Sequence, residues 1–180
     1  MFSFFLKRKK LIVLTGGPCA GKTTVLNLLQ EQGYSVISET AREIIEKQIA
    51  KGGDIVPWIK LKEFQRAVAW NQFFKELFSE KNSTAFLDRS LIDGVGYSRL
   101  GNILPYWIIQ YLGRNRYDMI FFLERLPLYL RDETRIEKEE FANNVSEEIR
   151  NAYKEYGYKT ESVPILTPEE RVRYILERIK

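Results

Sequence analysis

The chain has 180 residues, of which 44% are hydrophobic and 29% are charged, and its formal net charge is +4. This composition is that of a folded protein, and the length suits one compact domain over residues 1–180. The absence of histidine excludes histidine acid–base catalysis and histidine-ligated zinc, and the single cysteine, Cys19, excludes an internal disulfide and fits a cytoplasmic location. The small basic excess is compatible with phosphate ligands, and no nucleic-acid-binding signature is visible.

The first ten residues, MFSFFLKRKK, combine phenylalanines with a basic run. They are interpreted as the start of the first strand, and weak contact of the phenylalanines with a membrane surface or a partner is the alternative. No part of the chain approaches the roughly 18 to 20 consecutive apolar residues of a membrane span. We therefore expect no membrane-spanning segment. The sequence carries no signal for the oligomeric state.

Strand and helix signals alternate along the rest of the chain. Strands are expected at residues 11–15, 34–38, 84–88 and 118–123 and within 158–166. Helices are expected at 22–32, 39–52 and 58–80, in pieces over 91–113, after a charged stretch at 131–144 as far as Tyr156, and at 167–180. This alternation predicts an α/β three-layer sandwich with about five parallel strands and helices on both faces. Ligands of such sheets bind at the carboxyl ends of the strands.

A phosphate-binding loop follows the first expected strand. The segment LIVLTGGPCAGKTT contains the spacing Gly16-x-x-x-x-Gly21-Lys22-Thr23, which is the Walker A pattern, and it lies between a strand and a helix. Glycines let backbone N–H groups approach an anion, and the lysine neutralises the β- and γ-phosphates. The Thr23 hydroxyl suits Mg²⁺. The expected nucleotide-binding residues are Gly16, Gly17, Pro18, Cys19, Ala20, Gly21, Lys22, Thr23 and Thr24.

Charged residues follow two other expected strands. Asp88 ends the strand TAFLD and is a candidate partner of Mg²⁺, and Arg89 beside it is a candidate for substrate or phosphate contact. Helix capping is the alternative for Asp88, and a structural salt bridge is the alternative for Arg89. Glu39 follows the second strand and is a candidate general base, with Arg42 one helical turn later as a substrate clamp. Capping and ion pairing are the alternatives for these two.

The charged stretch after the fourth expected strand, which contains Arg125, Arg131 and Arg135, is a candidate lid. Arg131 and Arg135 are spaced to share one helix face, and they are stronger candidates than Arg125 for stabilising charge on a transferred phosphoryl group. A solvated charged surface is the alternative reading of this stretch.

Several segments together resemble a known family. The segments are LTGGPCAGKTT, SETAREII, FLDRSLIDGVGY, RDETR and YKEYGY…VP…EERVRYIL, and they are similar to P-loop domains related to bacterial ribosylnicotinamide kinase and to the TRP-channel translocation-defect ATPase-like proteins. The resemblance implies that Gly16 to Thr24 hold a triphosphate, that Asp88 serves the metal, and that Arg131 and Arg135 belong to a lid. It also implies that Glu39, Arg42 and Asp93 line the acceptor side, and that residues 163–167 border the nucleotide base.

Two functions are compatible with these signals. The leading hypothesis is a kinase that transfers the γ-phosphoryl group of ATP or GTP, with Mg²⁺, to a small nucleoside-like acceptor. The other is an NTPase or nucleotide-dependent switch that binds a protein or lipid partner. Lys22, Glu39, Asp88, Arg131 and Arg135 are the expected catalytic residues, and Thr23 and Asp88 are the expected metal ligands. Glu39, Arg42, Arg89 and Asp93 are the expected acceptor-binding residues.

Overall fold

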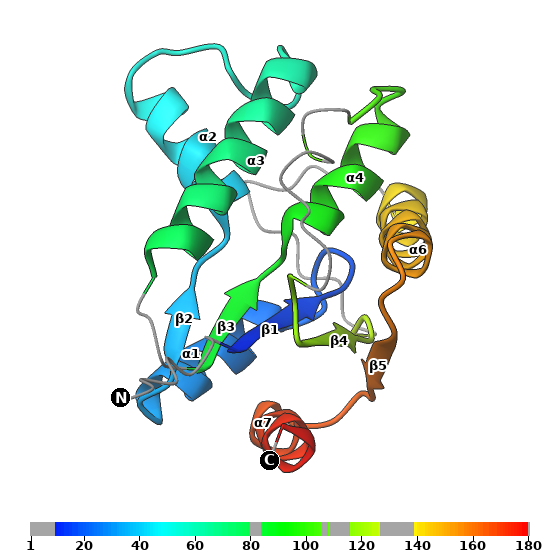
Figure 1. Ribbon diagram of the computed structural model, residues 1–180. Coiled ribbons are helices and arrows are strands. Elements are labelled where there is room, and N and C mark those ends of the chain that lie inside the picture. Colours follow the sequence, from blue (N-terminus) through cyan, green and yellow to red (C-terminus); the bar gives the residue numbers. More distant parts are fainter. Residues whose placement is uncertain (1–9, 80–83, 106–107, 109–115, 127–138, 180) are drawn as a thin grey trace, which may run out of the picture.

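The computed structural model describes residues 10–79, 84–105, 108, 116–126 and 139–179. Residues 1–9, for which a strand start or a membrane or partner contact was expected, lie outside the described residues. The described chain folds around one parallel sheet with the strand order β2-β3-β1-β4-β5 (Figure 1). The strands are β1 (Lys10–Thr15), β2 (Ser35–Ile37), β3 (Thr84–Asp88), β4 (Met119–Leu123) and β5 (Thr160–Val163). The expected five-stranded parallel sheet is confirmed.

Strand β1 lies at the centre of the sheet. Its residue Val13 is in register with Leu87 of β3 and with Ile120 of β4. Alternate side chains of β1 enter different cores, because successive residues of a strand point to opposite faces. Leu11 and Val13 pack into one core, and Ile12 and Leu14 pack into the other. Burial on both faces explains why the strand sequence is apolar throughout.

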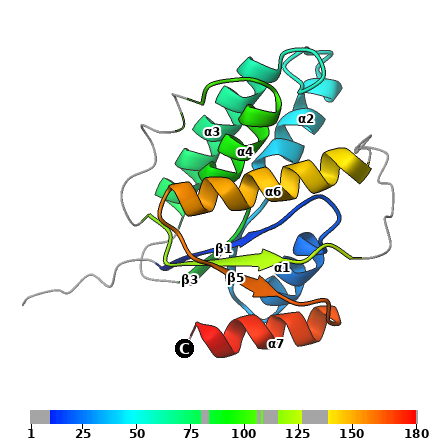
Figure 2. The same cartoon turned by 90° about the vertical axis from the view of Figure 1, so that its right-hand side faces the viewer.

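Helices cover both faces of the sheet (Figure 2). The helices α1 (Lys22–Glu31) and α7 (Pro168–Arg178) lie together on one face. The other face carries α3 (Leu61–Phe78), α4 (Leu91–Leu100) and α6 (Glu139–Glu155), and α2 (Thr40–Ala50) packs against α3. This arrangement is the expected three-layer sandwich. Among the described residues, no helix is long and apolar enough to cross a bilayer.

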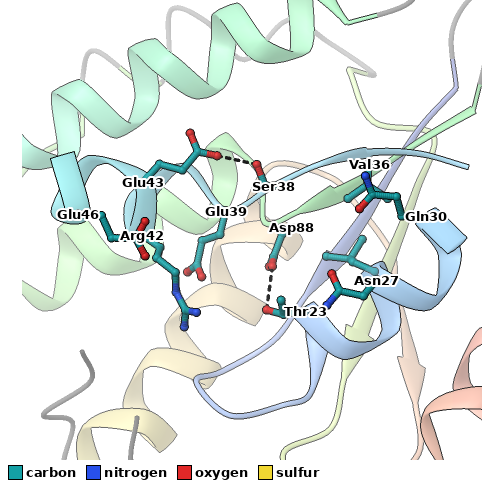
Figure 3. Close-up of a pocket in the computed structure, with 11 residues that line it drawn as sticks. Thr23, Asn27, Gln30, Val36, Ser38, Glu39, Arg42, Glu43, Glu46 and Asp88 are labelled. Carbon is teal, nitrogen blue, oxygen red and sulfur yellow. Dashed lines mark hydrogen bonds between the residues drawn. The ribbon is translucent and has the colours of Figure 1, made fainter. Parts of the chain in front are cut away.

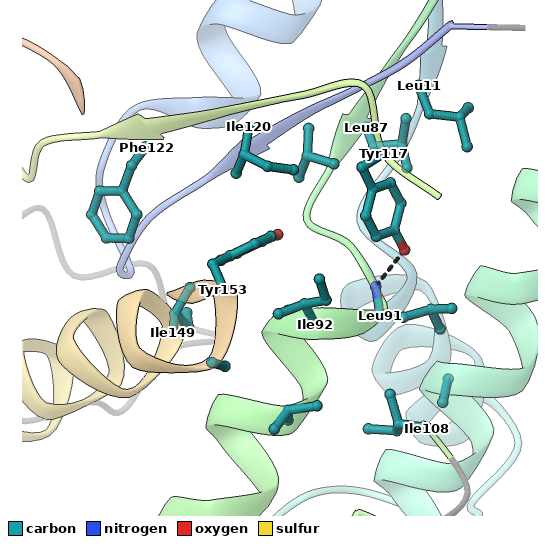
Figure 4. Close-up of a cluster of buried hydrophobic side chains, with 14 of the residues drawn as sticks. Leu11, Leu87, Leu91, Ile92, Ile108, Tyr117, Ile120, Phe122, Ile149 and Tyr153 are labelled. Carbon is teal, nitrogen blue, oxygen red and sulfur yellow. Dashed lines mark hydrogen bonds between the residues drawn. The ribbon is translucent and has the colours of Figure 1, made fainter. Parts of the chain in front are cut away.

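The core on the α3, α4 and α6 face contains a polar group with a defined partner. The Tyr117 hydroxyl accepts a hydrogen bond of 3.1 Å from the backbone N–H of Leu91, which is the first residue of α4 (Figure 4). Because only two residues separate Leu91 from β3, this contact holds the end of that strand against the core. The strand end in turn carries Asp88 and Arg89.

The extent of the charged stretch at 131–144 needs a correction. The charged stretch was expected to continue to residue 144, but α6 begins at Glu139. Ala142, Val145 and Ile149 recur at helical spacing and are fully buried, and the last two belong to the core on this face of the sheet. Burying a large apolar side chain stabilises the fold by about 1.5–3 kcal/mol. This stabilisation favours a helix here, although the residues around the buried positions are polar. Arg131 and Arg135 lie outside the described residues, so the lid stays a prediction.

Candidate active site

The loop after β1 approaches the neighbouring backbone very closely. Gly16 has a φ angle of 137°, and a Cβ atom there would lie 2.5 Å from the carbonyl oxygen of Leu123 at the end of β4. Gly21 has a φ angle of 79° and directly precedes α1. An L side chain rarely adopts these angles, so glycine is required at both positions. The positions of these two glycines in the sequence are therefore explained by the backbone angles of the loop and, at Gly16, by its close approach to β4.

Lys22 begins α1 and folds back over this loop. Its Nζ donates hydrogen bonds to the carbonyl oxygens of Gly16 and Gly17, at 3.2 and 2.9 Å, and the residue is only 4% exposed. The positive end of the helix dipole adds to the ammonium charge at the same place. The loop therefore combines close backbone approach with positive charge, which suits an anion.

Asp88 and Thr23 meet beside the loop. The Thr23 hydroxyl donates to Oδ2 of Asp88 at 3.3 Å, while Oδ1 of Asp88 is buried without a hydrogen-bond partner. Burial raises the pKa of Asp88, and the Glu39 carboxylate adds to this, whereas Lys22 and Arg89 oppose it. A cation would satisfy the orphaned oxygen and offset the burial.

The two residues fit a Mg²⁺ ion. Magnesium is usually held by one or two carboxylates together with water and substrate phosphates, and not by a cage of protein ligands. Among the described residues there is no group of three or more His, Cys, Asp or Glu side chains arranged for a metal. The Thr23 hydroxyl and Asp88 Oδ1 are the groups that would hold the ion.

Glu39 and Arg89 form an ion pair across the ends of two strands. The Nε atom of Arg89 donates to Oε1 of Glu39 at 3.0 Å, and both side chains are nearly buried. Arg89 NH1 also donates to the carbonyl oxygen of Gly16 at 3.3 Å, so the same guanidinium contacts the phosphate loop. Burial alone lowers the pKa of this guanidinium, but the Tyr97 hydroxyl and three surrounding carboxylates raise it well above its ordinary value.

The backbone at Arg89 is strained. Its φ angle of 70° is in the left-handed region, which is unfavourable for a residue with a long side chain. The Arg89 N–H donates to the carbonyl oxygen of Leu14 in β1 at 3.1 Å, and this bond holds the strained conformation. Such strain persists where the surrounding structure fixes it, commonly at functional sites.

Asp93 lies beneath this pair, at 1% exposure. Its carboxylate accepts hydrogen bonds from the Ser90 N–H at 2.9 Å, from the Tyr153 hydroxyl at 2.6 Å and from the Thr15 hydroxyl. It closes the capping box of α4. In this structure Asp93 is thus a buried support of the strand ends, and its expected contact with an acceptor stays a prediction.

A cavity of about 160 Å³ opens between α1, α2 and the end of β3 (Figure 3). Thr23, Glu39, Arg42 and Asp88, which come from three separate segments of the sequence, share its wall. The other lining residues are Leu26, Asn27, Gln30, Val36, Ser38, Glu43 and Glu46. The structure therefore brings the expected metal pair and two of the expected acceptor residues to one concave site.

Arg171 is a residue near the site to which the sequence analysis assigns no role. It is 2% exposed, and its guanidinium contacts the carbonyl oxygen of Ala20 in the phosphate loop at 2.6 Å. Burial lowers its pKa, and nearby Glu124 opposes this. A signal was present in the sequence, because Arg171 shares the buried stripe of α7 with Val172 and Ile175. A charged residue on an apolar stripe indicates a specific partner.

A family model described as an AAA domain matches residues 11–171. The chain belongs to this family. The match includes the phosphate loop, Glu39 and Asp88, and together with the fold it confirms the expected class, a P-loop kinase or ATPase. A search of curated proteins found no match.

Solved structures with the same fold have low sequence identity to the chain. One is the NadR protein in complex with NR, with a TM-score of 0.72 and 19% identity over 95% of this chain. The chain spans 50% of that protein's length. Another is the deoxyadenosine kinase from M. mycoides with dCMP and dCDP bound, with a TM-score of 0.67, 17% identity, and coverage of 94% of this chain and 97% of the kinase. A NadR structure with NAD and AMP-PNP gives a TM-score of 0.67 at 19% identity, covering 95% of this chain and 48% of that one.

Proposed function

We propose that this chain is a Mg²⁺-dependent phosphotransferase that transfers the γ-phosphoryl group of ATP or GTP to a hydroxyl of a small nucleoside-like acceptor. The observation that carries the proposal is the shared cavity. It places the Glu39 carboxylate, held by Arg89, in the same wall as the Thr23–Asp88 pair. A base for an acceptor hydroxyl and a metal position for the donor phosphates are the two parts that phosphoryl transfer requires.

The phosphate loop and Lys22 would hold the donor. The Lys22 ammonium, now on the carbonyl oxygens of Gly16 and Gly17, is within the loop that would surround the β- and γ-phosphates. Mg²⁺, held by Thr23 and Asp88, would neutralise charge on the phosphate oxygens. Cys19, with a φ angle of 57°, contributes backbone to this loop. Its thiol has no assigned chemical role.

Glu39 would accept the proton of the acceptor hydroxyl. With no histidine in the chain, a carboxylate is the natural base, and the hydrogen bond from Arg89 fixes the orientation of this one. Arg42 lies in the wall of the same cavity and would contact the acceptor. Arg131 and Arg135 remain the proposed lid residues, on the strength of the sequence alone.

The base of the nucleotide would lie against residues 163–167. This segment carries two exposed apolar side chains, Ile165 at 53% and Leu166 at 36%, which suit contact with a flat heterocycle. Arg171 links the segment directly to the phosphate loop, through Pro164 and Ala20. A nucleoside-like acceptor is supported by the similar structures, since one contains NR and another contains dCMP and dCDP.

The proposal is tested by an isosteric change that removes the charge of the proposed base. In Glu39→Gln the shape is kept and the proton acceptor is lost, so phosphoryl transfer to the best acceptor should fall by about 10²–10⁴-fold. ATP affinity should change little. Glu63→Gln, an exposed change at the start of α3 and away from the cavity, is the matched control and should leave both unchanged. Equal transfer rates in Glu39→Gln and the control would contradict the assignment of the base.

A further inference from the structure

Arg171 of α7 joins three loops that follow three different strands. Its NH1 contacts the carbonyl oxygen of Ala20 at 2.6 Å, its NH2 contacts that of Glu124 at 3.1 Å, and its Nε contacts that of Pro164 at 3.1 Å. Ala20 lies in the phosphate loop after β1, Glu124 directly follows β4, and Pro164 directly follows β5. All three contacts lie at the carboxyl edge of the sheet.

We infer that Arg171 is a positioning residue for the phosphate loop, which it holds in the conformation that binds a polyphosphate. The inference rests on the proposed function, because it assumes that the loop binds phosphate. Arg171 itself has no contact with phosphate in this assignment. It acts through the backbone of Ala20 and Gly21.

The geometry of the peptide bond links Arg171 to the anion side of the loop. In a trans peptide the C=O and the following N–H point in opposite directions, and the described chain has no cis peptide bond. Because Arg171 holds the carbonyl oxygen of Ala20, the N–H of Gly21 is turned away from Arg171. Gly21 has a φ angle of 79°, and without this contact the flexible glycine could rotate its peptide. A fixed N–H is what an anion-binding loop requires.

The chemistry of the guanidinium explains why an arginine occupies this position. Its planar group presents several N–H donors in a fixed fork, which can reach three carbonyl oxygens at once. Lysine has a compact ammonium and cannot span the same three loops. The three hydrogen-bond partners are neutral peptide groups, and the nearby Glu124 carboxylate offsets only part of the guanidinium charge. The remaining positive charge lies behind the loop, where it favours an anion on the other side.

The contact with Pro164 extends the inference to the base side of the nucleotide. The segment at 164–167 and the phosphate loop are tied to one rigid group, so their spacing is fixed before a nucleotide binds. Pre-organisation of this kind lowers the cost of ordering the loops on binding.

The test measures the binding of inorganic tripolyphosphate and of ATP by Arg171→Met and Arg171→Lys. Tripolyphosphate reports on the phosphate loop alone, because it has no base. Arg178→Met is the matched control, since Arg178 lies on the same helix but contacts Glu161 at an exposed position. Urea unfolding of each ligand-free variant measures stability separately. A residue that only stabilised the fold would change the unfolding curve and leave the affinity of the folded fraction intact.

Arg171→Met should weaken both ligands by about ten-fold or more, the size expected for charge-assisted hydrogen bonds. Arg171→Lys should weaken them too, and Arg178→Met should bind like the wild type. Wild-type affinity in a folded Arg171→Met or Arg171→Lys would overturn the inference, and so would the failure of both variants to fold, since the role would then be one of folding. If the wild type binds neither ligand, the proposed function fails and the inference fails with it.

Discussion

The guanidinium of Arg89 donates from Nε to Oε1 of Glu39 across 3.0 Å and from NH1 to the carbonyl oxygen of Gly16 across 3.3 Å. One side chain thus links Glu39, the second residue after β2, to the phosphate loop after β1. The proposed base and the proposed phosphate site are therefore held at a fixed separation.

Lys22→Ala should abolish nucleotide binding and turnover while the protein stays folded. The lysine Nζ donates to two carbonyl oxygens of the loop, and Lys22 belongs to neither buried apolar cluster of the described residues. Its loss therefore removes charge from the phosphate site and leaves those clusters unchanged. Calorimetry measures the affinity for ATP and GTP, and the far-ultraviolet circular dichroism spectrum shows whether the protein stays folded. Lys62→Ala, an exposed change on α3, is the control. Unchanged affinity and turnover in Lys22→Ala would refute the assignment of the phosphate site.

Gly16→Ala should lower stability and nucleotide affinity together. The added Cβ would lie 2.5 Å from the Leu123 carbonyl oxygen, so the loop or the end of β4 must shift. Gly33→Ala is the matched control, because Gly33 also has a positive φ angle, 88°, but a Cβ there meets no atom within 4 Å. The control should lose about 1–2 kcal/mol of unfolding free energy from backbone strain and keep its nucleotide affinity. A Gly16→Ala variant that loses no more than the control in either measurement would contradict the close approach.

Bound Mg-nucleotide should protect the thiol of Cys19 from bulky reagents, and prior labelling should block nucleotide binding. Cys19 is partly buried within the loop between Gly16 and Gly21, which must surround the phosphates. The labelling rate with and without saturating nucleotide is the measurement. It needs no variant, since this is the chain's single cysteine. Equal rates would place the nucleotide elsewhere.

The capping box of α7 should make stability depend on pH in the acidic range. Hydrogen bonds from the backbone N–H and the hydroxyl of Thr167 lower the pKa of Glu170 below its ordinary value of 4.5. Because the folded-state pKa is the lower one, this contribution is complete above the ordinary value and is lost as the pH falls through the folded-state value. Urea unfolding of the wild type and of Glu170→Gln from pH 7 to pH 3 tests this. The difference between them should shrink as the pH falls, and a constant difference would count against an ionised cap.

Much of the fold follows from local sequence signals. The apolar run of β1 and the glycine spacing after it specify a buried strand and an anion-binding turn, and Thr167 with Glu170 specifies the start of α7. The start of α6 was placed too late, because the charges around Glu139 concealed the apolar spacing of Ala142, Val145 and Ile149.

The supports of the site were less predictable, because they depend on contacts between distant segments. Gln72 on α3 is 3% exposed and accepts a hydrogen bond from the Thr40 hydroxyl, next to Glu39. It also donates to the Arg89 carbonyl oxygen at 3.5 Å. Nothing in the local sequence of α3 marks a glutamine for this role, since the pairing arises only when α2, α3 and β3 pack together. The three carbonyl partners of Arg171 likewise come from segments far apart in the chain.

The central claim is transfer to an acceptor, and it is tested most directly by following the γ-phosphoryl group itself. The protein is incubated with γ-labelled ATP or GTP, Mg²⁺ and a panel of nucleosides and other hydroxylated acceptors. The amounts of label in the acceptor and in inorganic phosphate are then measured. The account predicts that at least one nucleoside-like acceptor carries most of the label and raises turnover well above hydrolysis without acceptor. Label recovered only as inorganic phosphate with every acceptor, together with a nucleotide affinity that changes when a lipid or protein partner is added, would contradict it and would favour a nucleotide-dependent switch.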